Sequence, residues 1–262
     1  MNKYFRLLWV QLKASSLQTM QYRVDFLTEG LISLFWTATA LIPLWVVFQN
    51  RQSVAGWSFP EALLVTGWFT LLQAILEGAI EPSLSSVVEY IREGTLDFVL
   101  LKPADAQFLV STAKFQPWRS TNVVTALILF GYAFQRLGRW PHPIDLLFSV
   151  VLLCASLLLL YSFWILTVSA AFYVVKVDNL TNLFASIFDA ARWPSSIFRG
   201  VLSLVFTFII PLTLMTTFPA LAMLGKLPVQ TLVLSIGGAA MFSFLSRRVW
   251  LRSISRYTSA SS

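Results

Sequence analysis

Long apolar runs alternate with short polar connections along the chain. The runs lie at about 26–48, 62–80, 115–134, 144–175, 201–215 and 228–245. A helix of about 20 apolar residues is long enough to cross the hydrocarbon of a bilayer. The pattern therefore predicts an all-α polytopic membrane protein with six transmembrane helices, in which residues 1–262 form a single domain.

Two stretches depart from this regular pattern. Residues 1–24 are basic and amphipathic, which favours an N-terminal helix lying in the membrane interface. The run 201–215 is short and contains Pro211, and residues 216–227 after it are interrupted by Pro219 and Gly225. We expect 216–227 to enter the membrane from outside and return without crossing, with its free backbone groups bonded to neighbouring helices or water.

The segment 81–107 separates the second and third apolar runs and is rich in carboxylates. A short helix is predicted within it, because Ser83 can cap its start and Gly94 can end it. One face of this helix is apolar, since four residues follow the spacing i, i+3, i+4 and i+7: Leu84, Val87, Val88 and Ile91. We expect the helix to lie flat at the membrane surface and to present its polar face to a partner.

The composition indicates that lipid surrounds most of the chain. Hydrophobic residues make up 57% of the sequence, mean hydropathy is +0.72 and only 12% of residues are charged, whereas soluble domains carry about 25% charged residues. The net charge of +7 would favour nucleic-acid binding in a soluble protein. Here the basic residues cluster between apolar runs, which indicates charge that orients the spans and contacts anionic lipid.

The distribution of Lys and Arg predicts the orientation. With six spans and a cytoplasmic N-terminus, fifteen basic residues fall on the inner side, where Lys and Arg are normally in excess. Four fall outside: Arg51, Arg136, Arg139 and Lys226. Both termini and the segment 81–107 are therefore expected in the cytoplasm. The connection 176–200 is expected there too, with an amphipathic piece around residues 180–190.

Motifs for intrinsic catalysis are missing from the sequence. It has no G-x-x-x-x-G-K-[ST] to cradle ATP phosphates and no H-E-x-x-H. His142 is the only histidine and Cys154 the only cysteine, so neither a His-based metal cluster nor an internal disulfide can form. We therefore predict no catalytic, cofactor-binding or metal-ligating residues and no enzymatic activity in this chain.

Polar side chains inside the first two predicted spans form two stripes. They are Glu29, Ser33 and Thr37 on the first span, and Thr66, Thr70, Gln73, Glu77 and Glu81 on the second. Polar residues within a membrane are energetically expensive and face protein or water. One interpretation is that a substrate path is lined by Glu29, Ser33, Thr37, Thr70, Gln73 and Glu77. The other is that the acidic residues are satisfied within a helix seam, by one another or by Arg23 and Arg119.

Three motifs carry a resemblance to a known family: IREGTLDFVLLKP (Ile91–Pro103), RWPSSIF (Arg192–Phe198) and FIIPLTLMTTFPA (Phe208–Ala220). In order and spacing, nearly the whole chain resembles the membrane subunits of bacterial ATP-binding-cassette transporters of the type-2, exporter-like permease class. The resemblance implies an inner-membrane permease that forms half of an export path for an unidentified substrate. It also implies a second permease subunit, identical or homologous, and two ATPase subunits that bind ATP and Mg.

The resemblance further implies a coupling helix between spans two and three that fits a groove on the ATPase. On this sequence it corresponds to Ser83–Lys102, with these contact residues: Glu89, Arg92, Glu93, Gly94, Thr95 and Asp97. Two other functions stay open. One alternative is a membrane scaffold that moves no substrate, and the other is a membrane-embedded enzyme that acts on lipid-like substrates.

Overall fold

The computed structural model describes residues 3–20, 23–173 and 178–257 of the chain. Helices make up most of these ranges, and no β-strand occurs within them. The predicted all-α class is therefore confirmed.

The elements follow one another in a simple order. They are α1 (Lys3–Met20), α2 (Arg23–Gln49), α3 (Phe59–Ile75), η1 (Leu76–Ile80), α4 (Glu81–Glu93), α5 (Asp97–Leu100), α6 (Ala106–Ser111), η2 (Pro117–Arg119), α7 (Ser120–Leu137), α8 (Pro143–Ser169), η3 (Ala170–Phe172), α9 (Asp178–Phe188), η4 (Asp189–Arg192), η5 (Ser195–Ile197), α10 (Val201–Leu204), η6 (Val205–Ile209), η7 (Thr213–Thr217), α11 (Phe218–Met223) and α12 (Val229–Ile254).

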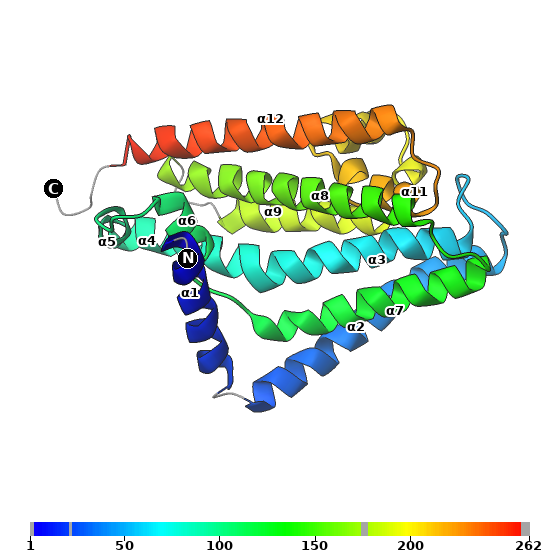
Figure 1. Ribbon diagram of the computed structural model, residues 1–262, viewed down its shortest axis with the longest axis horizontal. Coiled ribbons are helices and arrows are strands. Elements are labelled where there is room, and N and C mark those ends of the chain that lie inside the picture. The colour runs from blue at the N-terminus through cyan, green and yellow to red at the C-terminus, as the bar shows by residue number, and fades with distance from the viewer. Residues whose placement is uncertain (1–2, 21–22, 174–177, 258–262) are drawn as a thin grey trace.

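The long helices form an elongated bundle. Helices α2, α3, α7, α8 and α12 run along its length, with α3 packed on α7 and α8 packed on α12 (Figure 1). Helices α4, α5 and α6 gather at one end, which we call the tip end, and α1 slants away from it (Figure 1). The loop of residues 50–58 and the turn 138–142 lie at the opposite end, which we call the loop end.

Within the described residues, four helical stretches are long and apolar enough to cross a membrane. They are Gly30–Gln49, Phe59–Glu93, Pro143–Phe172 and Val229–Ile254, and a fifth candidate is the bent pair Val201–Ile209 and Thr213–Met223. Large apolar side chains are exposed along these stretches, for example Leu31 (68%), Phe35 (65%) and Leu234 (75%). Extended exposed apolar surface of this kind marks contact with lipid or with another protein.

The second span and the segment after it form one continuous helical stretch. Helix α3 passes through the π-helical turn η1 directly into α4, so the separate start expected at Ser83 is wrong. Instead, the Ser83 hydroxyl donates to the Lys114 carbonyl at 2.5 Å and accepts the Lys114 N–H at 3.0 Å. The predicted end at Gly94 is confirmed, because Gly94 adopts a left-handed conformation with φ 70°.

The run 201–215, expected as the fifth span, is bent. The arms Val201–Ile209 and Thr213–Met223 meet at 70° around Pro211, because proline lacks the N–H that would continue the helix and its ring blocks the preceding turn. The bend lies within the bundle, where the Ser156 hydroxyl of α8 donates to the Leu214 carbonyl at 3.2 Å. The second arm returns to the loop end, where Lys226 pairs with Glu61 of α3 at 2.5 Å.

The connection 176–200, expected in the cytoplasm, instead reaches the loop end through its described part. Phe184 and Phe188 of α9 are buried in the core that α3 and α8 share. The Ser196 hydroxyl accepts the Trp57 indole N–H at 3.0 Å and donates to the Ala55 carbonyl at 3.1 Å. Residues 178–197 therefore run along the bundle, and their expected position as an amphipathic piece on one surface is wrong.

Candidate functional site

A polar cavity of about 550 Å³ opens between four elements of the bundle, namely α2, α3 with η1, the start of α7 with η2, and η4. Pockets of 300–1,000 Å³ are typical of small-molecule sites. Five of the six side chains predicted to line a path do line this cavity: Ser33, Thr37, Thr70, Gln73 and Glu77. The sixth, Glu29, lies on α2, and its side chain falls outside what the structure describes.

An ion pair borders the cavity on the side nearer to the tip end. The Arg119 guanidinium lies 2.8 Å from the Glu77 carboxylate, and the Gln73 amide donates to the same carboxylate at 2.8 Å. Both charged side chains are largely buried, with 28% and 21% of their surface exposed. The seam interpretation therefore holds for Glu77. The same side chain also faces the cavity, so the two interpretations do not exclude each other.

Hydroxyl groups cover much of the remaining wall, and most of them bond to their own helices. Thr37 donates to the Ser33 carbonyl at 2.9 Å, and Thr70 donates to the Thr66 carbonyl at 2.9 Å. The Ser33 hydroxyl reaches across to the side chain of Asn122 on α7. Each hydroxyl oxygen keeps acceptor capacity after it has donated, so this wall offers a ligand acceptors within an otherwise apolar bundle.

Sequence reasoning missed the fourth wall of the cavity, which η4 provides. Arg192 pairs with Asp189 at 3.0 Å, and its guanidinium carbon lies 5.0 Å from the centre of the Phe69 ring. Both charged residues line the cavity. Arg192 begins the RWPSSIF motif, but the segment had been placed outside the membrane. The sequence pattern of a charged pair that faces a cavity is the same as that of a charged pair in a surface loop, so the sequence alone does not distinguish them.

The tip end presents a second candidate surface, formed by the end of α4, the turn after it and α5. Of the six predicted contact residues, Glu89, Arg92 and Glu93 are exposed, and the others are half-buried: Gly94, Thr95 and Asp97. The inner face of the tip is anchored in the bundle, because Leu84, Val87 and Leu96 are fully buried. The apolar stripe of α4 therefore packs into the core of the bundle through Leu84, Val87 and Val88, and not against a membrane surface.

Two large apolar side chains complete the tip and were not among the predicted contacts. Phe98 is 70% exposed and Leu101 is 81% exposed. They lie beyond the end of the Phe59–Glu93 stretch, next to exposed Lys102. An apolar pair among charged residues is typical of a protein-docking surface. Its signal in the sequence was the apolar patch 98–101 that follows Gly94.

No group of three or more His, Cys, Asp or Glu side chains that could hold a metal ion occurs in the described ranges. The cavity lining contains no histidine and no cysteine. The cavity offers polar groups and space for a small ligand, and the tip end offers an exposed apolar pair for a protein partner.

Comparison with known proteins places the chain in a described family. Residues 34–261 match the model of a family described as ABC-2 family transporter protein. No curated protein and no solved structure matches the chain.

Proposed function

This chain belongs to the ABC-2 family of transporter proteins, and from that premise we propose that it is one half of an ATP-driven exporter in the bacterial inner membrane. The family supplies the transmembrane component of the transporter and not the catalytic one, and it implies an ABC ATPase partner. We propose that ATP is hydrolysed on that separate subunit. A second permease, identical or homologous, completes the path.

The proposed membrane arrangement has six crossings, with the fifth reassigned. Helix α9 with η4 and η5 crosses in place of 201–215, which is supported by the buried Phe184 and Phe188 and by the contacts of Ser196 at the loop end. The arms α10–η6 and η7–α11 then form the re-entrant segment, because Ser196 before them and Lys226 after them both lie at the loop end.

The proposed orientation keeps the tip end in the cytoplasm. The reassignment moves Arg199 to the loop end, and Arg192 lines the cavity. Arg119 lines the cavity as well, so twelve basic residues remain on the tip side against five on the loop side. An excess of this size supports a cytoplasmic position of the tip side.

The cavity carries the proposal of transport. It joins polar groups of α2, α3, α7 and η4 inside the bundle, where polar groups are retained mainly for a ligand path or for helix association. In the proposed cycle the ATPase binds the tip through Phe98, Leu101 and the predicted contacts. Closure of the ATPase moves the tip, and the cavity walls rearrange around the substrate.

Copurification tests this proposal directly. The tagged chain is isolated from its native membrane, and the copurifying proteins and the ATP hydrolysis of the complex are measured. We expect a stoichiometric ATPase with a Walker motif, and no hydrolysis by the chain alone. A stable complex with other proteins but no ATPase would support a scaffold, and turnover of lipid without nucleotide would support an enzyme.

A further inference from the structure

Helix α6 follows the tip, by which we mean the end of α4, the turn after it and α5. Its Phe108 ring meets the Tyr4 ring of α1 edge-on, with centroids 4.9 Å apart, and Thr112 just after it donates to Gln11 of α1 at 2.6 Å. Helices α4 and α5 also pack against it. The tip is therefore fastened to the bundle not only through the continuous α3–α4 stretch but also through this short helix.

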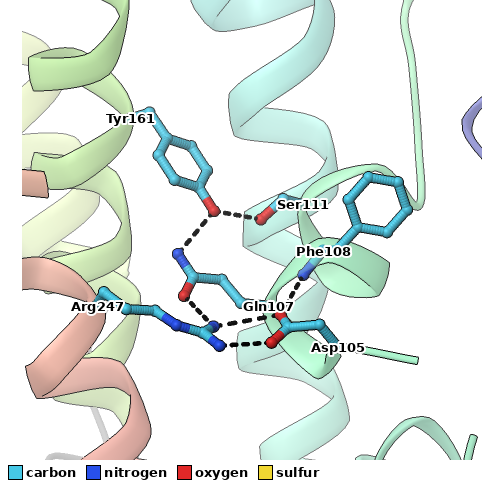
Figure 2. Close-up of polar contacts among 6 residues, drawn as sticks. All are labelled: Asp105, Gln107, Phe108, Ser111, Tyr161 and Arg247. Atoms are coloured by element: carbon cyan, nitrogen blue, oxygen red, sulfur yellow. Dashed lines mark hydrogen bonds and ion pairs between the residues drawn. The ribbon is translucent and has the colours of Figure 1, made fainter. Parts of the chain in front are cut away.

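The polar side chains at the start of α6 bind α12 (Figure 2). Arg247 of α12 donates to both oxygens of the Asp105 carboxylate, at 3.2 and 2.5 Å, and to the Gln107 side-chain carbonyl at 2.6 Å. We call these three residues the clamp. A guanidinium that holds a carboxylate through two parallel bonds fixes orientation as well as distance.

The clamp also reaches α8. The Gln107 amide donates to the Tyr161 hydroxyl at 2.9 Å, and Ser111 shares a hydrogen bond with the same hydroxyl at 2.7 Å (Figure 2). Gln107 is buried, with 8% of its surface exposed. Both α8 and α12 run from the tip end to the loop end (Figure 1), so a displacement of α6 acts on one end of two long rigid helices.

The clamp is charged under ordinary conditions. Burial raises the pKa of the Asp105 carboxyl, but hydrogen bonds from Arg247 and from the Phe108 N–H outweigh that effect and hold it below its usual value. The carboxylate is therefore ionised throughout the neutral pH range. The side chains of Asp105 and Arg247 are only partly buried, at 36% and 39% exposure, so water can reach the pair.

We propose that the clamp is the transmission contact of this permease, which carries movement of the ATPase-bound tip through α6 to α8 and α12. The proposal rests on the proposed function, because it assumes an ATPase at the tip. Asp105, Gln107 and Arg247 act as positioning residues, at a distance from the cavity. When the clamp is disrupted, the ATPase still binds the tip, but the shape of the cavity no longer changes with the nucleotide state of the ATPase.

The test uses the complete complex of this chain with its ATPase in proteoliposomes, in a Cys154→Ala background. A Thr37→Cys substitution in the cavity wall reports the shape of the cavity through its rate of labelling by a thiol reagent. The rate is compared without nucleotide and with ATP plus vanadate. In the otherwise unaltered complex we expect a change of about fivefold or more, which is the lower range of coupling between distant sites.

Two substitutions break the clamp. Asp105→Asn removes the charge but keeps a side chain that caps helix starts well, so α6 can still begin at the same residue. Arg247→Gln removes the other partner. We expect both variants to copurify with the ATPase at the unaltered level. The change that nucleotide causes in the labelling rate of the cavity cysteine should fall below about twofold. The double variant should be no worse than either single one, because both remove the same contact.

Arg248→Gln is the matched control, since it removes the same charge one residue further along α12, from a side chain that stacks on Phe244 at 4.8 Å. It should keep the full response. A full response in the clamp variants overturns the proposal, and so does loss of ATPase copurification in both, which would make the clamp a structural support of the tip. A complex without any nucleotide response before substitution overturns the proposed function and the clamp together.

Discussion

At the scale of single residues, the ion pair between Glu77 and Arg119 is the most consequential contact of the cavity. The two groups approach to 2.8 Å at the junction of η1 and η2, and both are largely buried. In a partly buried position the pair is tolerated because the charges compensate each other, whereas either charge left alone loses its counter-ion and is only partly hydrated. The pair therefore fixes the start of α7 against the second span while it keeps charge beside the cavity.

Removing one partner of this pair should destabilise the protein more than removing both. We expect Arg119→Gln to lower stability by about 1–3 kcal/mol, because the Glu77 carboxylate is left without its counter-ion. Glu77→Gln with Arg119→Gln should recover part of that loss. The midpoint of thermal unfolding in detergent measures both. A double variant that is destabilised by the sum of the two single effects would show that the charges do not interact.

At the scale of elements, the tip depends on the backbone at Gly94. The residue ends α4 with φ 70°, a conformation that a β-branched side chain resists and that asparagine tolerates. Gly94→Val should therefore change the direction in which the chain leaves α4 for α5, and so weaken ATPase copurification. Gly94→Asn should keep ATPase copurification at the unaltered level. Equal copurification by the two variants would mean that the direction of the chain at this point does not matter for docking.

The exposed apolar pair of the tip gives a second prediction for this element. Burying a leucine side chain at an interface contributes about 1.5–3 kcal/mol, so Leu101→Glu should weaken ATPase binding at least about tenfold, and Phe98→Glu should act likewise. Trp140→Glu is the control, because Trp140 is 73% exposed but lies in the turn at the loop end. Titration of the ATPase onto the immobilised chain measures each affinity. An unchanged affinity for both tip variants would exclude the pair from the interface.

The sequence predicts the elements whose signal is periodic and local. The stripes through Ser33, Thr37, Thr70 and Gln73 meet in one cavity because a helical period of about 3.6 fixes the face of each residue, and the end of α4 follows from a glycine. The position of α9 was not predicted, because an amphipathic pattern with Phe184 and Phe188 fits a helix at the membrane surface as well as one whose apolar side packs in the core that α3 and α8 share. The clamp pairs residues 142 positions apart, and no local pattern records such a contact.

At the scale of the whole molecule, the path of residues 178–226 decides the topology. A chain that crosses with α9 and then dips in and out on the loop side leaves Arg199 outside, whereas counting charges with 201–215 as a span put it inside. In the reassigned topology, residues 213–223, which pack on α8, belong to a re-entrant segment and not to a full crossing. The two topologies therefore predict opposite sides for one exposed residue.

Cysteine labelling in intact cells separates these topologies. In a Cys154→Ala background, cysteines at Ser53, His142 and Arg199 should react with an impermeant thiol reagent from outside, because all three are exposed at the loop end of the proposed arrangement. Cysteines at Lys102 and Arg256, exposed at the tip end, should react only after the membrane is opened. Ser53 and His142 serve as the internal standard, since both topologies place them outside. Protection of Arg199 together with labelling of Ser53 and His142 would return the fifth crossing to 201–215, and it would contradict the proposed crossing by α9, η4 and η5.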